Sequence, residues 1–586
     1  MLLSQNGLCH YTLEAEDGSG DISMQLKSSP ELDELFIVLN FKEAAVPKRV
    51  VLHFAIPLND IEGLWHPAAD TRKTLRPDWL KPFDAHAAYS APIMTLFSGG
   101  GENRLTFACS DAMNIVRLNA GVHEETAQVY CSVFLLDAVM APLTHYEAIV
   151  RVDRRLVSFS KAISDTALWW EGLGYTSFSA PDQAYKPFFS TWYSMHQNLM
   201  KEEIEAQCMA AKAFGCESVI VDDGWQTDDN RRGYSYCGDW VPCAAKMGDM
   251  RTHVARVHEM GLKYLLWYSV PFIGIHSNTF EQFKPYFLSF DERRGAGTLD
   301  PRYPHVREYL ISLYESAFIN WDIDGLKLDF IDVFFQPKEE MPSVPPGRDT
   351  SSVPHAVDWL MKAIVARISA IKPQAMIEFR QNYIGPAMRC YGNLFRAADC
   401  PGDRTLNRVR TVDIRLMSGH TAIHSDMLMW HPDETPESAI KQFLNVYFAV
   451  PQISMDMRKL PKSHQDAYAF YLKRWLADRK TLFGGQFTAH GPHMQYPLIT
   501  AEDGMRFIAA VYGCWVITLP SIPHATIINA GDDTDVFLMS ASCRTVHVHI
   551  YTVSGELIRS EPLCLPKGPV ALPIPCGGLA DLYEHA

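Results

Sequence analysis

The sequence lacks any run of basic residues, and its 586 residues carry a formal net charge of −15. Because an acidic surface repels phosphate backbones, nucleic acid is not an expected partner. It also lacks an apolar stretch long enough to cross a bilayer. The longest, around residues 264–275, is interrupted by a serine and a proline. We therefore expect no membrane association.

The first residues contain no basic start, no apolar centre and no small-residue cleavage site, so they do not resemble a signal peptide. The 13 cysteines are scattered and are never spaced Cys-x-x-Cys. This distribution is typical of reduced, mostly buried thiols. We expect a cytoplasmic protein with neither a disulfide scaffold nor a zinc site, and the sequence indicates no cofactor.

The composition is that of a folded protein of two or three domains, with 47% hydrophobic and 21% charged residues. Residues 1–170 consist of short strand-like runs, such as 35–39, 49–54 and 127–134, which predict an N-terminal β-sandwich. Similar runs return near the end of the chain, at 506–512 and 545–551. They predict a small C-terminal β-sandwich over 489–586.

Between these domains, residues 171–488 alternate short apolar runs with amphipathic helical stretches. Such alternation indicates parallel strands joined by helices, and eight units favour a closed (β/α)8 TIM barrel over an open sheet. The eight runs lie at 188–192, 218–222, 264–269, 325–329, 375–379, 393–398, 421–424 and 448–453.

Polar residues follow the predicted barrel strands, where barrel enzymes build their sites. They are Asp222, Asp223, Trp267, Lys327, Asp329, Arg396, Asp399 and Asp426. A lone aspartate after a strand is more often a helix N-cap, and we interpret Asp332 and Asp403 in that way. Capping does not explain two adjacent aspartates, nor a lysine and an aspartate on one strand face.

A retaining glycosidase needs two carboxyl groups roughly 5–5.5 Å apart, one as nucleophile and one as acid/base. Asp329 suits the nucleophile, because Lys327 lies beside it and should keep it ionised. Asp399 is followed by Cys-Pro-Gly, which offers little charge compensation. We therefore predict that Asp399 keeps its proton and serves as the acid/base.

The ordered motifs of the barrel region resemble the retaining α-galactosidases of glycoside hydrolase family 36, in the melibiase-like clan D, with this chain as a divergent member. The motifs are Val-Asp-Asp-Gly-Trp at 221–225, Cys-Gly-Asp-Trp at 237–240, Gly-Leu-Lys-Tyr-Leu-Leu-Trp at 261–267, the run at 299–309, Gly-Leu-Lys-Leu-Asp at 325–329, Phe-Arg-Ala-Ala-Asp at 395–399 and Ser-Asp-Met-Leu at 425–428.

The resemblance implies hydrolysis of terminal α-galactosides through a covalent galactosyl-aspartate on Asp329, with Asp399 as the acid/base. Asp222 and Asp223 are expected to bind the 4- and 6-hydroxyls of galactose, and Lys327 to hold a ring hydroxyl and the nucleophile. Further expected substrate contacts are Arg396 near the acid/base, the pocket-lining Trp192, Trp225 and Trp267, and Trp65, which would lean over the site from the first domain.

Two loops depart from the family pattern. After the third strand the chain reads Trp-Tyr-Ser-Val-Pro at 267–271, without the family's acidic residue. After the fifth it reads Arg-Gln-Asn-Tyr-Ile-Gly at 380–385 instead of a Cys-Ser-Gly-Gly type loop. Two alternatives therefore stay open on the same site, a galactosyl transferase of raffinose-synthase type and an α-N-acetylgalactosaminidase.

Two further alternatives belong to other classes. His420 and His424, followed by Asp426 and His431, could serve a metal-dependent hydrolase, although there is no His-Glu-x-x-His motif. A non-catalytic sugar-binding protein is disfavoured because both Asp329 and Asp399 are present. The expected partner is an α-galactoside or oligosaccharide substrate, and assembly into a homo-oligomer stays open.

Overall fold

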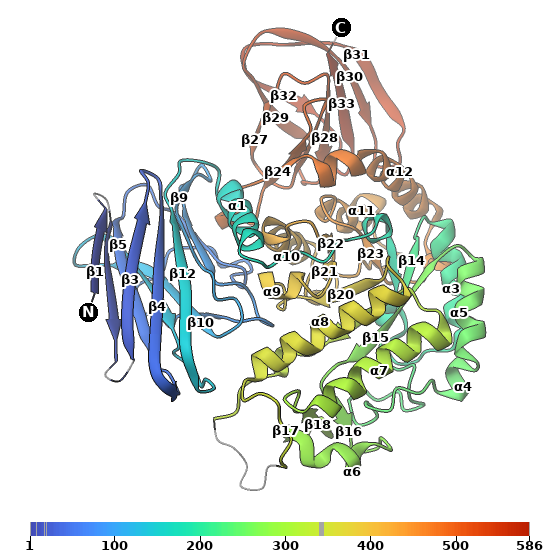
Figure 1. The fold of residues 1–586 in the computed structure, drawn as a ribbon. Helices are drawn as coiled ribbons and strands as arrows, with labels where there is room; N and C mark the ends of the chain where they lie inside the picture. Colours follow the sequence, from blue (N-terminus) through green and yellow to red (C-terminus); the bar gives the residue numbers. More distant parts are fainter. Residues whose placement is uncertain (1, 7–8, 17, 19, 339–344, 585–586) are drawn as a thin grey trace.

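The computed structural model describes residues 2–6, 9–16, 18, 20–338 and 345–584. The chain forms an N-terminal pair of antiparallel sheets, a central barrel and a C-terminal β-domain (Figure 1). The predicted domain limits at residues 170 and 488 fall within helix α1, Phe159–Gly172, and strand β24, Gln486–His490.

The N-terminal sandwich consists of two six-stranded sheets, β1-β2-β5-β11-β10-β7 and β3-β4-β12-β9-β8-β6. Along β11 and the first eight residues of β4 every second side chain is buried, as expected for strands with one face on a core. The strands are β1 Leu2–Asn6, β2 Cys9–Ala15, β3 Asp21–Ser28, β4 Leu32–Ala45, β5 Val50–Pro57, β6 Gly63–Trp65, β7 Phe83–Ala85, β8 Ile93–Phe97, β9 Asn103–Cys109, β10 Val116–His123, β11 Gln128–Leu135 and β12 Leu143–Asp153.

The barrel contains the eight predicted strands, all parallel, in the order β22-β21-β20-β19-β15-β14-β13-β23. Parallel bridges from His424 to Val450 and from Leu428 to Ile453 close the gap between its first and last strands. The strands are β13 Phe188–Ser190, β14 Ser218–Val221, β15 Lys263–Ser269, β19 Gly325–Asp329, β20 Met376–Arg380, β21 Leu394–Arg396, β22 Ala422–His424 and β23 Gln452–Ile453. The predicted TIM barrel is confirmed.

Helices connect these strands and cover the barrel (Figure 1). The longer ones are α3 Lys201–Ala213, α5 Met250–Glu259, α7 Pro304–Trp321, α8 Val353–Ile371, α10 Arg404–Met417, α11 Pro436–Asn445 and α12 Lys462–Gly484. The short elements are α2 Trp192–Met195, α4 Ala244–Met247, α6 Phe280–Phe283, α9 Pro386–Arg389, the 3-10 turns η1 Asp182–Tyr185, η2 Lys284–Tyr286, η3 Ile331–Val333, η4 Met457–Lys459 and η5 Pro492–Met494, and strands β16 Phe272–Gly274, β17 Phe287–Asp291 and β18 Ala296–Leu299. None of the helices in the described part of the chain is long and apolar enough to cross a membrane.

The inside of the barrel changes from apolar to charged along the strands. The lower layer is an apolar cluster that includes Phe188, Ile220, Leu265, Met376, Leu394 and Ala422. Because side chains on a strand alternate between faces, the residues two positions further point inward again. Those residues are Asp222, Trp267, Lys327, Glu378, Arg396 and His424, all buried. Buried charges are costly unless they are paired, which marks this upper layer as a candidate site.

The C-terminal domain packs a seven-stranded sheet, β24-β25-β26-β28-β33-β30-β31, against a three-stranded one, β27-β29-β32. Its remaining strands are β25 Leu498–Glu502, β26 Arg506–Val511, β27 Val516–Leu519, β28 His524–Asn529, β29 Asp535–Ser540, β30 Arg544–Tyr551, β31 Leu557–Leu565, β32 Gly568–Pro573 and β33 Leu579–Glu584.

A buried carboxylate on α10 joins all three parts of the molecule. Asp413 accepts hydrogen bonds from Trp65 Nε1 at 2.8 Å and Lys73 Nζ at 2.9 Å, both from the N-terminal sandwich. It also accepts one from the hydroxyl of Tyr496, which lies beyond β24. The prediction that Trp65 leans over the substrate is therefore wrong: its ring is fully buried in this junction.

Candidate active site

Asp329, at the end of β19, is the most heavily bonded carboxylate of the barrel rim. Its Oδ1 accepts hydrogen bonds from Arg380 Nε at 2.9 Å, from the backbone N–H of Phe330 at 2.8 Å and from the Tyr383 hydroxyl. Its Oδ2 accepts only a longer bond, 3.3 Å, from Trp267 Nε1. One oxygen is thus fixed by the protein, while the other has a single weak contact.

Asp329 is held in the ionised form. Burial alone would raise the pKa of this carboxyl, but the charges of Arg380 and Lys327 and the bonds to Oδ1 outweigh it and lower the pKa. Lys327 contributes only through its charge, since its ammonium donates to Asp222. The expectation that Lys327 holds the nucleophile directly is wrong, because Arg380 takes that contact.

Asp222 and Asp223, after β14, are both buried and neither caps a helix. Asp222 pairs with Lys327 and accepts the Asp223 backbone N–H at 2.9 Å. Asp223 accepts from the side-chain amides of Gln197 and Gln226, the latter at 2.8 Å. Burial raises the pKa of Asp223 to about 6. Two fixed carboxyl groups side by side can accept from neighbouring hydroxyls of a polyol.

Asp399 shares one arginine with a second carboxylate. The buried Arg396 donates from Nη2 to Asp399 at 2.9 Å and from Nη1 to Asp426. Burial would raise the pKa of Asp399, but the Arg396 guanidinium dominates and lowers it to about 2. The prediction of a protonated, uncompensated Asp399 is therefore wrong for the ligand-free protein. Arg396 lies only three positions earlier and reaches the carboxylate, whose side chain is 48% exposed.

Asp329 ends β19 and Asp399 lies three residues after β21, so both lie at the carboxyl rim of the barrel. The charges of Lys327 and Arg380 act on both carboxylates and lower the pKa of each. Arg396 supports Asp399 as expected. An ionised, buried carboxylate and a second, half-exposed one thus share the carboxyl rim of the barrel.

The two predicted helix caps have different outcomes. Asp403 caps α10 by accepting from the backbone N–H of Leu406 at 2.9 Å, as predicted. Asp332 is not a cap, because it lies inside η3, whose N-cap is Phe330 in the left-handed region at φ 64°. Its Oδ1 is buried without a hydrogen-bond partner.

The predicted aromatic lining is only partly present. Trp267 contacts Asp329, and Trp192 is half-buried at the start of α2 with the Arg232 guanidinium 5.8 Å from its ring centre. Trp225 is fully buried, and its Nε1 donates to the Trp267 carbonyl at 2.9 Å. Trp225 therefore supports Trp267 from behind and does not line the pocket.

Sequence reasoning missed three side chains on or after β20. Arg380 and Tyr383 bind Asp329, and Glu378 is fully buried beside Arg396 with its Oε1 3.7 Å from Arg396 Nε. Burial raises the pKa of Glu378. The strand alternation could have found two of them, because Met376, Glu378 and Arg380 occupy successive inward positions.

We expect Arg380→Gln to shift the acid limb of the kcat/KM–pH profile upward by about one unit. The Arg380 charge lowers the pKa of Asp329, so its removal raises that pKa and a larger fraction of Asp329 is protonated at low pH. Arg380→Lys keeps the charge and serves as the matched control. An unchanged profile in Arg380→Gln would show that Asp329 does not control this limb.

The histidines of the alternative metal site do not meet. His420 is exposed and lies 3.9 Å from Glu171. His424 is buried, its Nε2 lies 2.8 Å from the Ala184 carbonyl, and burial lowers its pKa to about 3. Because one histidine is exposed and the other is buried, the two do not lie on one face where they could bind the same metal ion.

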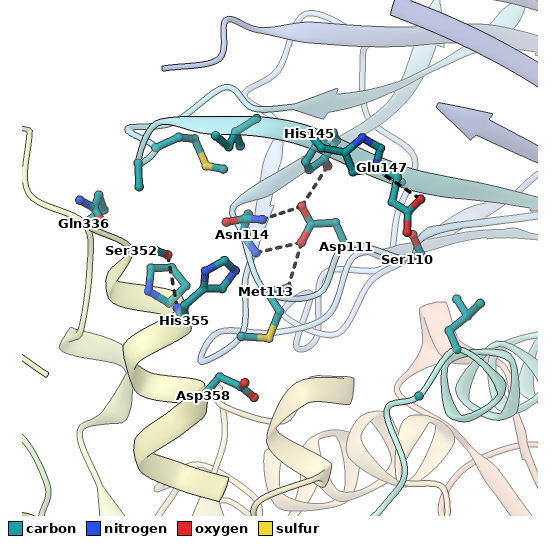
Figure 2. A pocket seen from close by; sticks show the side chains of 18 of the residues that line it. Ser110, Asp111, Met113, Asn114, His145, Glu147, Gln336, Ser352, His355 and Asp358 are labelled. Carbon is teal, nitrogen blue, oxygen red and sulfur yellow. Dashed lines mark hydrogen bonds and ion pairs between the residues drawn. The ribbon is translucent and has the colours of Figure 1, made fainter. Parts of the chain in front are cut away.

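A cleft of about 900 Å³ lies between the N-terminal sandwich and α8, and none of the carboxylates described above lines it (Figure 2). Two of its carboxylates, Asp111 and Asp358, are held by hydrogen bonds within the protein. Asp111 accepts from the backbone N–H groups of Met113 and Asn114 and from the Tyr146 hydroxyl at 2.9–3.1 Å. Asp358 accepts from Lys362 and Tyr391. We therefore take the barrel rim as the candidate active site.

A closed parallel barrel with paired carboxylates and cations at its carboxyl rim is the arrangement of (β/α)8-barrel glycoside hydrolases. Residues 181–353 match the Melibiase family model. The α-galactosidase Mel36A of Lactobacillus acidophilus is 27% identical over 159 residues, which are 24% of this chain and 21% of that protein. AgaA of Geobacillus stearothermophilus is 26% identical over 148 residues, covering 24% and 20%. Over residues 181–353 the chain is therefore similar to the melibiase family, and the relatives that match it are α-galactosidases.

The sequence matches span about a fifth of the length of these curated relatives. The fold likeness extends much further. The structure of AgaA aligns with a TM-score of 0.64 at 14% identity, covering 98% of this chain and 89% of that one. The α-galactosidase of Lactobacillus brevis aligns with a TM-score of 0.61 at 14% identity, covering 99% and 82%. The three-part architecture is therefore shared, whereas the sequences have diverged.

Proposed function

We propose that the protein is a retaining α-galactosidase that cleaves terminal α-galactosides through a covalent galactosyl-aspartate. The observation that carries this proposal is Asp329, a buried carboxylate kept ionised by Arg380 and Lys327, with one oxygen fixed and the other weakly bound. Such an oxygen suits attack on an anomeric carbon.

In the first step Asp329 Oδ2 attacks the anomeric carbon, and the bond to the glycosidic oxygen breaks as Asp399 gives that oxygen a proton. Asp399 must therefore be protonated when substrate is bound. A bound sugar would cover this half-exposed carboxyl and exclude water, which raises its pKa. In the second step Asp399 takes a proton from water, whose oxygen attacks the anomeric carbon and frees Asp329 with net retention.

The sugar would lie with its hydroxyls toward Asp222, Asp223 and Lys327. Solved structures of AgaA hold 1-deoxygalactonojirimycin, raffinose and stachyose, which supports an α-galactoside as the substrate class here. Asp223, with a pKa of about 6, can donate as well as accept a hydrogen bond in weak acid.

Two alternatives use the same intermediate. A galactosyl transferase would pass the sugar to another sugar instead of water. An α-N-acetylgalactosaminidase would accept a substituent at the 2-position of the sugar; a relative named for a 2-amino sugar is the A type blood alpha-D-galactosamine galactosaminidase of Flavonifractor plautii, which is 25% identical over 169 residues, 26% of this chain and 15% of that protein. Arg380 and Tyr383 both occupy space beside Asp329, which favours a small 2-hydroxyl over a 2-acetamido group.

A panel of nitrophenyl α-glycosides of galactose, N-acetylgalactosamine and glucose tests the proposal, with NMR of the first-formed sugar. We expect turnover of the galactoside and release of the α-anomer. Added sugar acceptors distinguish hydrolysis from transfer by their products. Release of the β-anomer, or no turnover of any α-galactoside, would contradict the proposal.

A further inference from the structure

We propose that Asp332 of the barrel and Tyr89 of the N-terminal sandwich bind the second sugar of the substrate, on its leaving-group side. This inference rests on the proposed function and names the part of the substrate that the two catalytic carboxylates do not hold. A binding site for the second sugar would make the protein selective for a sugar over an aryl or simple alkyl leaving group.

Asp332 carries a carboxyl oxygen without a hydrogen-bond partner in the described part of the chain, three residues after Asp329. Its Oδ1 is buried and makes no hydrogen bond with the described residues. Burial raises the pKa of Asp332, while the charge of Arg380 opposes that rise and the charge of Asp329 adds to it. The carboxyl thus lies within the electrostatic reach of the nucleophile and its arginine. A buried, unsatisfied carboxyl in a native fold calls for an explanation, and a bound hydroxyl supplies one.

Tyr89 approaches Asp332 from the other domain. Tyr89 precedes Ser90, whose backbone contacts the loop after β20, and Asp332 follows the neighbouring strand β19. Burial raises the pKa of the Tyr89 phenol, and the charges of Asp84 and Asp332 add to this rise. The Tyr89 ring is half-buried and stacks on His86, with ring centres 5.8 Å apart. No hydrogen bond of its hydroxyl occurs among the described residues, and this hydroxyl is not a buried orphan. A phenol hydroxyl so placed can bind a ligand.

The loop that contains Tyr89 packs against the loop that follows β20. The Ser90 backbone N–H donates to the Asn382 carbonyl at 2.6 Å. At Gly385 the two chains approach so closely that a Cβ would lie 2.4 Å from the Ser90 carbonyl oxygen. The position of Tyr89 relative to the barrel rim is therefore set by backbone contacts.

A second contact from the sandwich reaches the acid/base side of the site. Asp70 pairs with Arg410 through two bonds of 3.0 Å, and Arg410 donates to the Asp399 carbonyl at 3.0 Å. The N-terminal sandwich thus touches the rim at the loop after β20 and beside Asp399. Because the leaving group departs beside the acid/base, this is the side where the second sugar would lie.

The occupant is a neutral sugar. Asp332 and Asp399 would repel an anion, and an apolar aglycone would leave Asp332 Oδ1 unsatisfied. A carboxyl and a phenol both donate and accept hydrogen bonds, as the vicinal hydroxyls of a pyranose require. The ring of Tyr89 also offers an apolar edge.

Three α-galactosides separate this role from catalysis: nitrophenyl, methyl and a galactosyl-α-1,6-glucose disaccharide. The nitrophenyl group leaves without a proton, methanol needs one, and the disaccharide needs a proton and carries the second sugar. We expect Tyr89→Phe to lower kcat/KM for the disaccharide about three- to tenfold, and Asp332→Asn about tenfold or more. Both variants should leave the other two substrates within about twofold.

Asp358→Asn, in the cleft of Figure 2, is the matched control and should change none of the three. An equal loss on methyl galactoside and disaccharide in Asp332→Asn would make Asp332 a proton donor and overturn the subsite. Parallel losses on all three substrates, or no loss, would overturn it as well. A wild-type protein inactive on nitrophenyl α-galactoside would refute the proposed function itself, and the subsite with it.

Discussion

Asp329→Asn should abolish turnover of α-galactosides, with a loss of about 10⁴-fold or more in kcat/KM, while the protein stays folded. The amide cannot form the glycosyl ester, yet it keeps the size of the side chain and can still accept from Arg380 and Phe330 at Oδ1. The measurement is kcat/KM on nitrophenyl α-galactoside, with circular dichroism and thermal unfolding to verify the fold.

Asp358→Asn provides the comparison, because Asp358 is an aspartate of α8 outside the barrel rim. It should retain wild-type kcat/KM. Loss of activity in Asp329→Asn together with a collapsed near-UV spectrum would point to a structural role. Retained activity would remove Asp329 from the chemistry.

Asp413→Ala should lower the free energy of unfolding by about 3–5 kcal/mol. Lys73 would be left buried without its carboxylate, and Trp65 and Tyr496 would lose their acceptor. Urea unfolding followed by tryptophan fluorescence is suited to this measurement, since Trp65 lies in the junction.

The double variant Lys73→Met with Asp413→Leu distinguishes an uncompensated charge from the loss of the ion pair. Apolar residues of similar volume often replace a buried pair at little cost. We therefore expect the double variant to be clearly more stable than Asp413→Ala. If both variants lose the same free energy, the hydrogen bonds of Trp65 and Tyr496 outweigh the ion pair.

The barrel was predictable because its signals are local. Each strand is a short apolar run followed by a polar residue, and each of the eight predicted runs overlaps an observed strand. The same two-residue alternation correctly placed Lys327 and Asp329 on the inner face. Extended to β20, it would also have indicated Glu378 and Arg380.

The wrong predictions concern two kinds of side chain. Some have hydrogen-bond partners far away in the sequence, and others have a protonation state that depends on a neighbouring charge. Trp65 ends the short strand β6, and only the fold shows that its Nε1–H donates a hydrogen bond to Asp413, 348 positions later. Trp225 belongs to a recognised motif, but a buried tryptophan and a pocket tryptophan have the same sequence signature. The pKa of Asp399 depends on its hydrogen bond with Arg396. Strand alternation places Arg396 inside the barrel, but it does not show that the guanidinium reaches a residue beyond the end of the strand.

The central claim is that Asp329 forms a covalent bond with the sugar. An activated fluorinated α-galactoside, which forms the glycosyl-enzyme faster than water releases it, allows a direct test by mass spectrometry of the proteolysed protein. We expect one galactosyl-type adduct on the peptide that contains Asp329, and none in Asp329→Asn. An adduct on another carboxylate, or steady turnover with inversion and no adduct, would contradict the claim.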